Sequence, residues 1–145
     1  MKTKTGIPFG LKSIRTDEFA TIELASIQSK KIQLDHSFTF SLNKDLNEIA
    51  VSFKIKFATR ERPFIVLRIT CIFEINPKSL LVSAKGREKT IQIPKDFMTH
   101  LASLTAGTAR GVLHTKLEPT QFNTYLLPII DVSKSFKDNV QFDLT

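Results

Sequence analysis

The apolar residues between positions 32 and 75 recur at every second position in three successive runs. In residues 32–42 the apolar side chains and His36 alternate with polar ones, and residues 49–57 follow the same pattern. Residues 64–75 are more continuously apolar. A period of two is expected of a strand with one buried and one wet face. Because only a few residues separate the runs, we predict antiparallel neighbours joined as a meander.

A helical period replaces this alternation after Pro94. The apolar and small residues that share the three-and-four spacing of one helix face are Phe97, Leu101, Leu104, Thr105, Thr108 and Val112. Proline is tolerated in a first helical turn, and Asp96 favours the same end through the helix dipole. Gly107 and Gly111 weaken the far end, so the position where the helix stops is left open.

The first residues carry no clear period. Residues 1–14 hold Gly6, Pro8 and Gly10 among lysines, which predicts a flexible N-terminal arm. An irregular first strand is predicted from Phe19 toward Ile27. Strands followed by a helix predict an α+β domain, with a four-stranded antiparallel meander and a long helix packed on one face. We expect one domain over residues 15–136 and a C-terminal tail at 137–145.

After the helix, residues 118–120 form a polar break and residues 125–130 form an apolar run that contains Pro128. Proline is excluded from central strands, so this run is expected in a groove or along an edge. The side chains predicted to border a polypeptide-binding groove there are Phe122, Tyr125, Leu126 and Leu127.

The chain carries 21 basic and 14 acidic residues, a net charge of +7, and an isoelectric point near 9.7. Residues 76–116 alone carry +5, which makes nucleic acid an alternative partner. A solvated basic surface is the simpler interpretation, because scattered lysines are ordinary surface chemistry. The phenylalanines lie in phase with aliphatic residues on the same strand faces. This placement favours core residues over a platform that stacks bases.

Signatures of catalysis and metal binding are missing from the sequence. His36, His100, His114 and the single Cys71 have no metal-ligand spacing, and neither CxxC, HExxH, GxSxG nor a phosphate-binding loop occurs. We therefore expect no enzyme activity, no metal and no cofactor. One cysteine within an apolar run fits a reducing compartment, and no signal peptide or membrane span is evident. The predicted location is the cytoplasm.

The order of elements, together with two short motifs, resembles the SecB family of protein-export chaperones and SecB-like proteins. The first motif is residues 108–111, Thr-Ala-Arg-Gly, and the second is residues 127–131, Leu-Pro-Ile-Ile-Asp. The residues that carry this signature are Arg110, Gly111, Pro128 and Asp131. The resemblance implies a sheet-plus-helix subunit assembled as a dimer of dimers. It also implies a holdase that binds unfolded or partly folded polypeptides in hydrophobic grooves without ATP.

The charge departs from this family, whose typical members are acidic and meet the SecA motor through negative surface. Because this chain carries a net charge of +7, its docking to SecA is in doubt. Protein export and an antitoxin-linked pathway both stay open for a SecB-like holdase. The alternatives to a holdase are a basic nucleic-acid-binding protein and a structural or assembly protein without catalytic activity.

Overall fold

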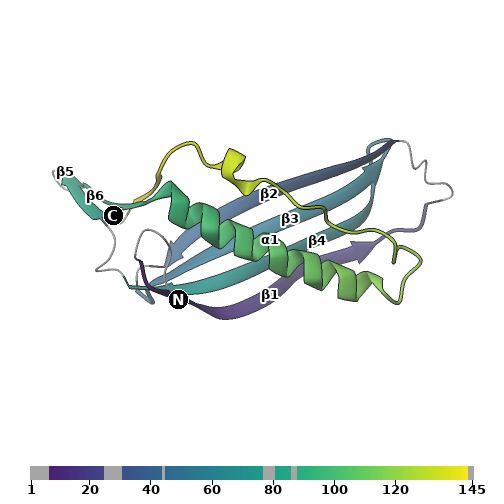
Figure 1. The fold of residues 1–145 in the computed structure, drawn as a ribbon, viewed down its shortest axis with the longest axis horizontal. Coiled ribbons are helices and arrows are strands. Elements are labelled where there is room, and N and C mark those ends of the chain that lie inside the picture. Colours follow the sequence, from purple (N-terminus) through teal and green to yellow (C-terminus); the bar gives the residue numbers. More distant parts are fainter. Residues whose placement is uncertain (1–6, 25–30, 44, 77–80, 86–87, 144–145) are drawn as a thin grey trace.

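The computed structural model describes residues 7–24, 31–43, 45–76, 81–85 and 88–143. One long helix packs on a four-stranded antiparallel sheet, which confirms the predicted α+β class (Figure 1). The sheet strands are β1 (Phe9–Thr21), β2 (Ile32–Asn43), β3 (Glu48–Thr59) and β4 (Arg62–Ile75), and the helix is α1 (Lys95–Leu117). A second, smaller sheet contains β5 (Leu81–Lys85), β6 (Glu88–Ile93) and β7 (Val140–Asp143).

The strand order in the large sheet is β1-β4-β3-β2. Strands β2, β3 and β4 form the predicted meander, whereas β1 lies on the outer side of β4 instead of beside β2. A two-residue turn joins β3 to β4, and both of its residues, Arg60 and Glu61, have positive φ angles of 50° and 65°. Two-residue hairpin turns of this kind match the twist of antiparallel strands.

The apolar face of the sheet packs against α1, and the opposite face is polar. Residues paired across strands share a face, so Phe53 of β3 and Ile69 of β4 lie together under the helix. The helix residues that complete this layer are Phe97, Met98, Leu101, Ala102, Thr105, Ala106, Ala109, Leu113 and Leu117, all buried. Each large apolar side chain buried here contributes about 1.5–3 kcal/mol, so this layer is the principal core.

The predicted loose arm is corrected by the structure over its second half. Residues 9–14 belong to β1, which pairs with β4 from Phe9 to Thr21, and Ile7 is buried. The register shifts between Leu11 and Ser13 and again between Thr16 and Glu18. Each shift inserts an extra residue, as a β-bulge does, and so breaks the period of two by which strands are recognised. The first strand therefore ends at Thr21 instead of running toward Ile27, which lies outside the described residues.

The helix continues past the glycines that left its end open. Gly107 and Gly111 are both helical, and α1 ends at Leu117. The chain then returns along α1 toward the start of the helix, between α1 and β2 (Figure 1). This returning segment contains one short 3-10 helix, η3 (Val132–Ser135), before residues 140–143 pair with β6. Residues 137–143 of the predicted tail are thus partly in a strand.

Candidate functional site

The sheet has two outer edges, and they differ in regularity. β1 carries two register shifts, whereas β2 pairs with β3 over twelve residues without a single shift. Within the described residues, no strand pairs with the outer side of β2. This side is called the free edge of β2 below. Bulges and charges blunt most natural sheet edges, so a long and regular free edge is a template for pairing with another chain.

An aromatic strip lies along the free edge, on the side of the sheet that faces the helix. Phe38 stacks on Phe53 of β3 at 4.3 Å between ring centroids, and Phe40 follows Phe38 at 6.2 Å. His36 meets Phe53 edge to face at 5.9 Å. Phe38 and Phe40 are only half-buried and His36 is exposed. The strip therefore presents apolar surface that neither α1 nor β3 fully covers.

The strip ends at the returning segment, residues 118–139, which we call the strap. Phe136 of the strap packs on Phe40 with 5.2 Å between ring centroids. At the other end of the strap, the Tyr125 ring packs against Phe57 and Phe64, with 5.7 Å and 5.3 Å between ring centroids. The strap thus lies along the same apolar face as the strip and shares its aromatic contacts.

The four side chains predicted to bind polypeptide all lie in the strap, but they have different environments. Phe122 and Leu127 are buried, Tyr125 is half-buried, and Leu126 is 57% exposed. Two of the four are therefore core residues in this chain and present no surface for a partner. The role of these four residues in polypeptide binding stays a prediction.

Arg110 connects the helix to the middle of the strap. Its Nε donates a hydrogen bond to the carbonyl oxygen of Leu127 at 2.9 Å, and a terminal guanidinium nitrogen donates to that of Pro128 at 3.0 Å. Asp131 accepts a hydrogen bond from the backbone N–H of Ser133 and so caps η3. The pKa of Asp131 is lowered, first by the hydrogen bond from the Ser133 hydroxyl.

Three of the four residues of the predicted fold signature thus organise the strap. Gly111 is different, because it lies on the exposed face of α1 and no atom comes within 4 Å of the position that a Cβ would take. Gly111 does not end the helix, and no other part of the described chain packs closely against it. The structure gives Gly111 no role in the strap.

A second apolar surface lies at the opposite edge, between β1 and α1. It is a groove of about 200 Å³ lined by Phe9, Gly10, Leu11, Phe73, Leu104 and Thr108. Leu11 is 51% exposed, Ile14 on the same strand is 50% exposed, and Leu104 is 37% exposed. Sequence reasoning missed this groove, because the bulges of β1 hid the strand that forms one of its walls.

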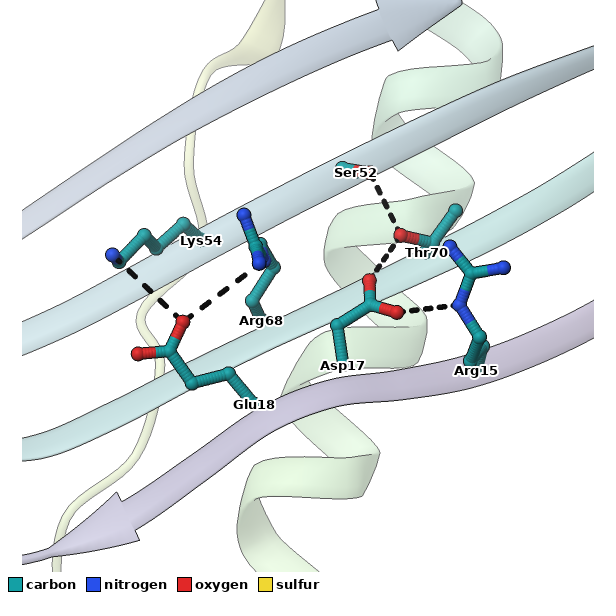
Figure 2. Close-up of polar contacts among 7 residues, drawn as sticks. All are labelled: Arg15, Asp17, Glu18, Ser52, Lys54, Arg68 and Thr70. Carbon is teal, nitrogen blue, oxygen red and sulfur yellow. Dashed lines mark hydrogen bonds and ion pairs between the residues drawn. The ribbon is translucent and has the colours of Figure 1, made fainter.

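The polar face of the sheet carries a chain of hydrogen bonds across three strands (Figure 2). The Ser52 and Thr70 hydroxyls lie 2.7 Å apart, Thr70 donates to the carboxylate of Asp17, and Arg15 Nε donates to the same carboxylate. Burial raises the pKa of Asp17, but the hydrogen bonds and the positive charges of Arg15 and Arg68 together lower it below its usual 3.8. Asp17 lies at the second bulge of β1, so this network holds the edge strand in its shifted register.

Charges on the rest of this face are exposed and of mixed sign. The Glu18 carboxylate lies 3.9 Å from Lys54 Nζ and 4.0 Å from Arg68 Nε, and all three side chains are more than 40% exposed. Exposed ion pairs of this kind contribute little to stability. A shallow recess of about 270 Å³ nearby is lined by Asp35, His36, Ser37, Lys54 and Lys56. Its lining mixes one acidic residue with two basic ones, as on an ordinary solvated surface.

Metal-binding and nucleophilic groups are sparse in the described part of the chain. No group of three or more His, Cys, Asp or Glu side chains there is arranged to hold a metal ion. Cys71 is buried beneath α1, and burial raises the pKa of its thiol. The thiolate is the reactive form, so Cys71 is poorly suited to nucleophilic chemistry.

The positive charge of the chain is concentrated outside the described residues. The masked positions hold six of the 21 basic residues and none of the acidic ones, which leaves 15 basic against 14 acidic residues in the described part. Two basic residues of the +5 segment contact other parts of the fold, Arg110 at the strap and Lys116 over the Phe19 ring at 5.3 Å. The net charge of +7 belongs to the chain as a whole.

Comparisons with models of protein families, with curated proteins and with solved structures find no match to this chain. The SecB resemblance rests on the sequence pattern given above. In the described ranges, no helix combines the length and the apolar character needed to cross a membrane.

Proposed function

We propose that this protein is an ATP-independent holdase of SecB-like type that binds extended segments of unfolded polypeptides in the cytoplasm. The observation that carries the proposal is the free edge of β2, twelve residues long and regular, with the half-buried aromatic strip beside it. An extended client would add to this edge as a fifth strand. Main-chain hydrogen bonds would supply affinity for any sequence, and contacts with the strip would favour apolar ones.

The chemistry of β2 fits an unselective partner. Its helix side presents Phe38 and Phe40, while Ser37 and Thr39 line its polar side. A client strand with alternating apolar and polar residues would extend both faces of the sheet without burying a charge. Every backbone offers the same donors and acceptors, so such a site is suited to many clients.

The contacts of two basic residues of the +5 segment favour a polypeptide client over nucleic acid. Binding to a nucleic-acid backbone depends on clustered positive charge, and Arg110 and Lys116 already contact other groups in the fold. Nucleic-acid binding is the alternative function that has to be distinguished from polypeptide binding. A steep loss of binding with added salt would identify it.

The experiment is suppression of aggregation. A reduced, unfolded client protein is diluted into buffer with or without the purified chain, without nucleotide, and light scattering is followed. The parent chain is expected to suppress scattering, and Phe38→Ala is expected to lose most of this effect because Phe38 is the centre of the strip. Unchanged scattering with the parent chain, together with no binding of an extended apolar peptide, would contradict the proposal.

Leu11→Ala is the matched control. Leu11 is also an exposed apolar side chain on an edge strand, but it lies on β1, across the sheet from the free edge of β2. We expect this variant to suppress aggregation as well as the parent chain does. Equal loss in both variants would assign the activity to general surface hydrophobicity and not to the β2 edge.

A further inference from the structure

We propose that the strap is a displaceable cover, and that its release extends the β2 site into a longer apolar groove beneath it. The inference rests on the proposed function, because the ligand is the same extended apolar polypeptide. The strap, residues 118–139, lies along α1 on the side of β2 (Figure 1). It contacts the aromatic strip directly through Phe136 on Phe40.

The strap already resembles a bound ligand in its conformation and contacts. Residues 125–131 have no regular secondary structure, and exposed residues separate the side chains that are buried or half-buried, Tyr125, Leu127 and Ile130. Tyr125 packs against Phe57 and Phe64, and Leu127 is buried farther along. An extended client with aromatic and aliphatic residues at similar spacing would meet the same surface.

The attachment of the strap is concentrated at few points. Within the described residues, the backbone of 126–130 receives hydrogen bonds from Arg110 alone, at Leu127 and Pro128. Leu126 and Ile129 face outward, and Ile129 is 92% exposed. Ile129 therefore loses almost no burial when the strap leaves, and Leu126 loses part of its contact surface. In the described residues, Arg110 alone hydrogen-bonds the middle of the strap, where Leu127 is also buried, and aromatic contacts hold the two ends of the strap.

A cover of this kind lowers the apparent affinity for clients. If clients occupy the groove only when the strap is released, the apparent dissociation constant is the intrinsic one divided by the released fraction. Loosening the strap must then raise client affinity by the same factor as it raises the released fraction. Removing a contact would thus improve function, which is the opposite of what a merely structural role predicts.

The test compares Arg110→Ala with the parent chain and with Lys116→Ala, a control that removes another basic residue of α1, one whose ammonium lies over the Phe19 ring of β1. Affinity for a fluorescent, extended apolar peptide is measured for each, with thiol reactivity of Cys71 as a second readout. Cys71 lies on β4 beneath α1, so it stays protected when only the strap moves and reacts when the core opens. We expect Arg110→Ala to bind the peptide about tenfold more tightly with Cys71 still protected, and Lys116→Ala to match the parent.

A second variant covers the case in which Arg110→Ala exposes Cys71 and so disturbs the core. Phe136→Ala loosens the other end of the strap and is expected to increase affinity in the same direction. If the parent chain binds the peptide and a strap variant with an intact core binds it no more tightly, the strap is not a displaceable cover. The proposed function would be unaffected by that result. Failure of the parent and of both strap variants to bind any peptide would overturn both proposals.

Discussion

Asp17 illustrates how one residue holds an edge strand in an irregular register. It accepts hydrogen bonds from Thr70 on the neighbouring strand and from Arg15, and its side chain is 17% exposed. We expect Asp17→Asn to lower the free energy of unfolding by about 1–2 kcal/mol at neutral pH, because the charge-assisted hydrogen bonds weaken. Urea unfolding followed by circular dichroism measures this difference.

The lowered pKa of Asp17 also makes the stability difference between the parent chain and Asp17→Asn depend on pH. A carboxyl whose pKa is lower in the folded than in the unfolded chain stabilises the fold above the unfolded pKa of about 4, and this contribution is lost as pH falls through the folded pKa. The stability difference between parent and Asp17→Asn should therefore shrink in acid. Glu18→Gln is the control, since its ion pairs are exposed and should change stability by no more than about 0.5 kcal/mol. A difference that stays constant from neutral pH down to acid unfolding would refute this role.

The sequence indicates where the strap lies better than it indicates which of its side chains are buried. An apolar run around a proline correctly indicated that residues 125–130 lie outside the sheet, and the Arg-Gly and Leu-Pro motifs do meet through Arg110 and Pro128. The sequence could not separate buried Phe122 from exposed Leu126, since burial depends on which side of an irregular segment faces the sheet. Irregular backbone has no period from which a face can be read.

At the scale of elements, α1 has a fully buried face and a wet face that carries its glycines. Gly111 is exposed, mid-helix, and open to a methyl group, so Gly111→Ala should stabilise the fold by about 0.5–1 kcal/mol. Thermal and urea unfolding test this. Leu113→Ala on the buried face is the counterpart and should cost about 2–5 kcal/mol. A destabilising Gly111→Ala would show that the glycine faces a partner.

The regular elements were predictable and the bulged one was not. β2, β3, β4 and α1 follow from periods of two and about 3.6, which burial of one face imposes on any sequence. The sequence predicts a loose arm up to residue 14 in place of the start of β1, because the two register shifts of β1 place extra residues between its apolar positions. Its pairing with β4 arises from tertiary contacts far along the chain, which local patterns do not encode.

The whole molecule presents two apolar edges. The groove between β1 and α1, with Leu11, Ile14 and Leu104 at its rim, is where we expect a second copy to pack in the dimer of dimers that the SecB resemblance implies. Leu11→Asp should shift the assembly toward smaller species by light scattering coupled to size exclusion, because a carboxylate would be buried in the interface. Suppression of aggregation per chain should change little. An unchanged mass for Leu11→Asp would show that the groove is not part of a subunit interface.

Pairing of clients with the free edge of β2 can be detected by amide hydrogen exchange. The chain is measured alone and with a saturating extended apolar peptide, and protection is compared for β2 and β1. We expect new protection at alternate amides of residues 32–43, because only every second N–H of an edge strand points outward, and we expect β1 to be unchanged. Binding of the peptide without added protection in β2 would contradict it.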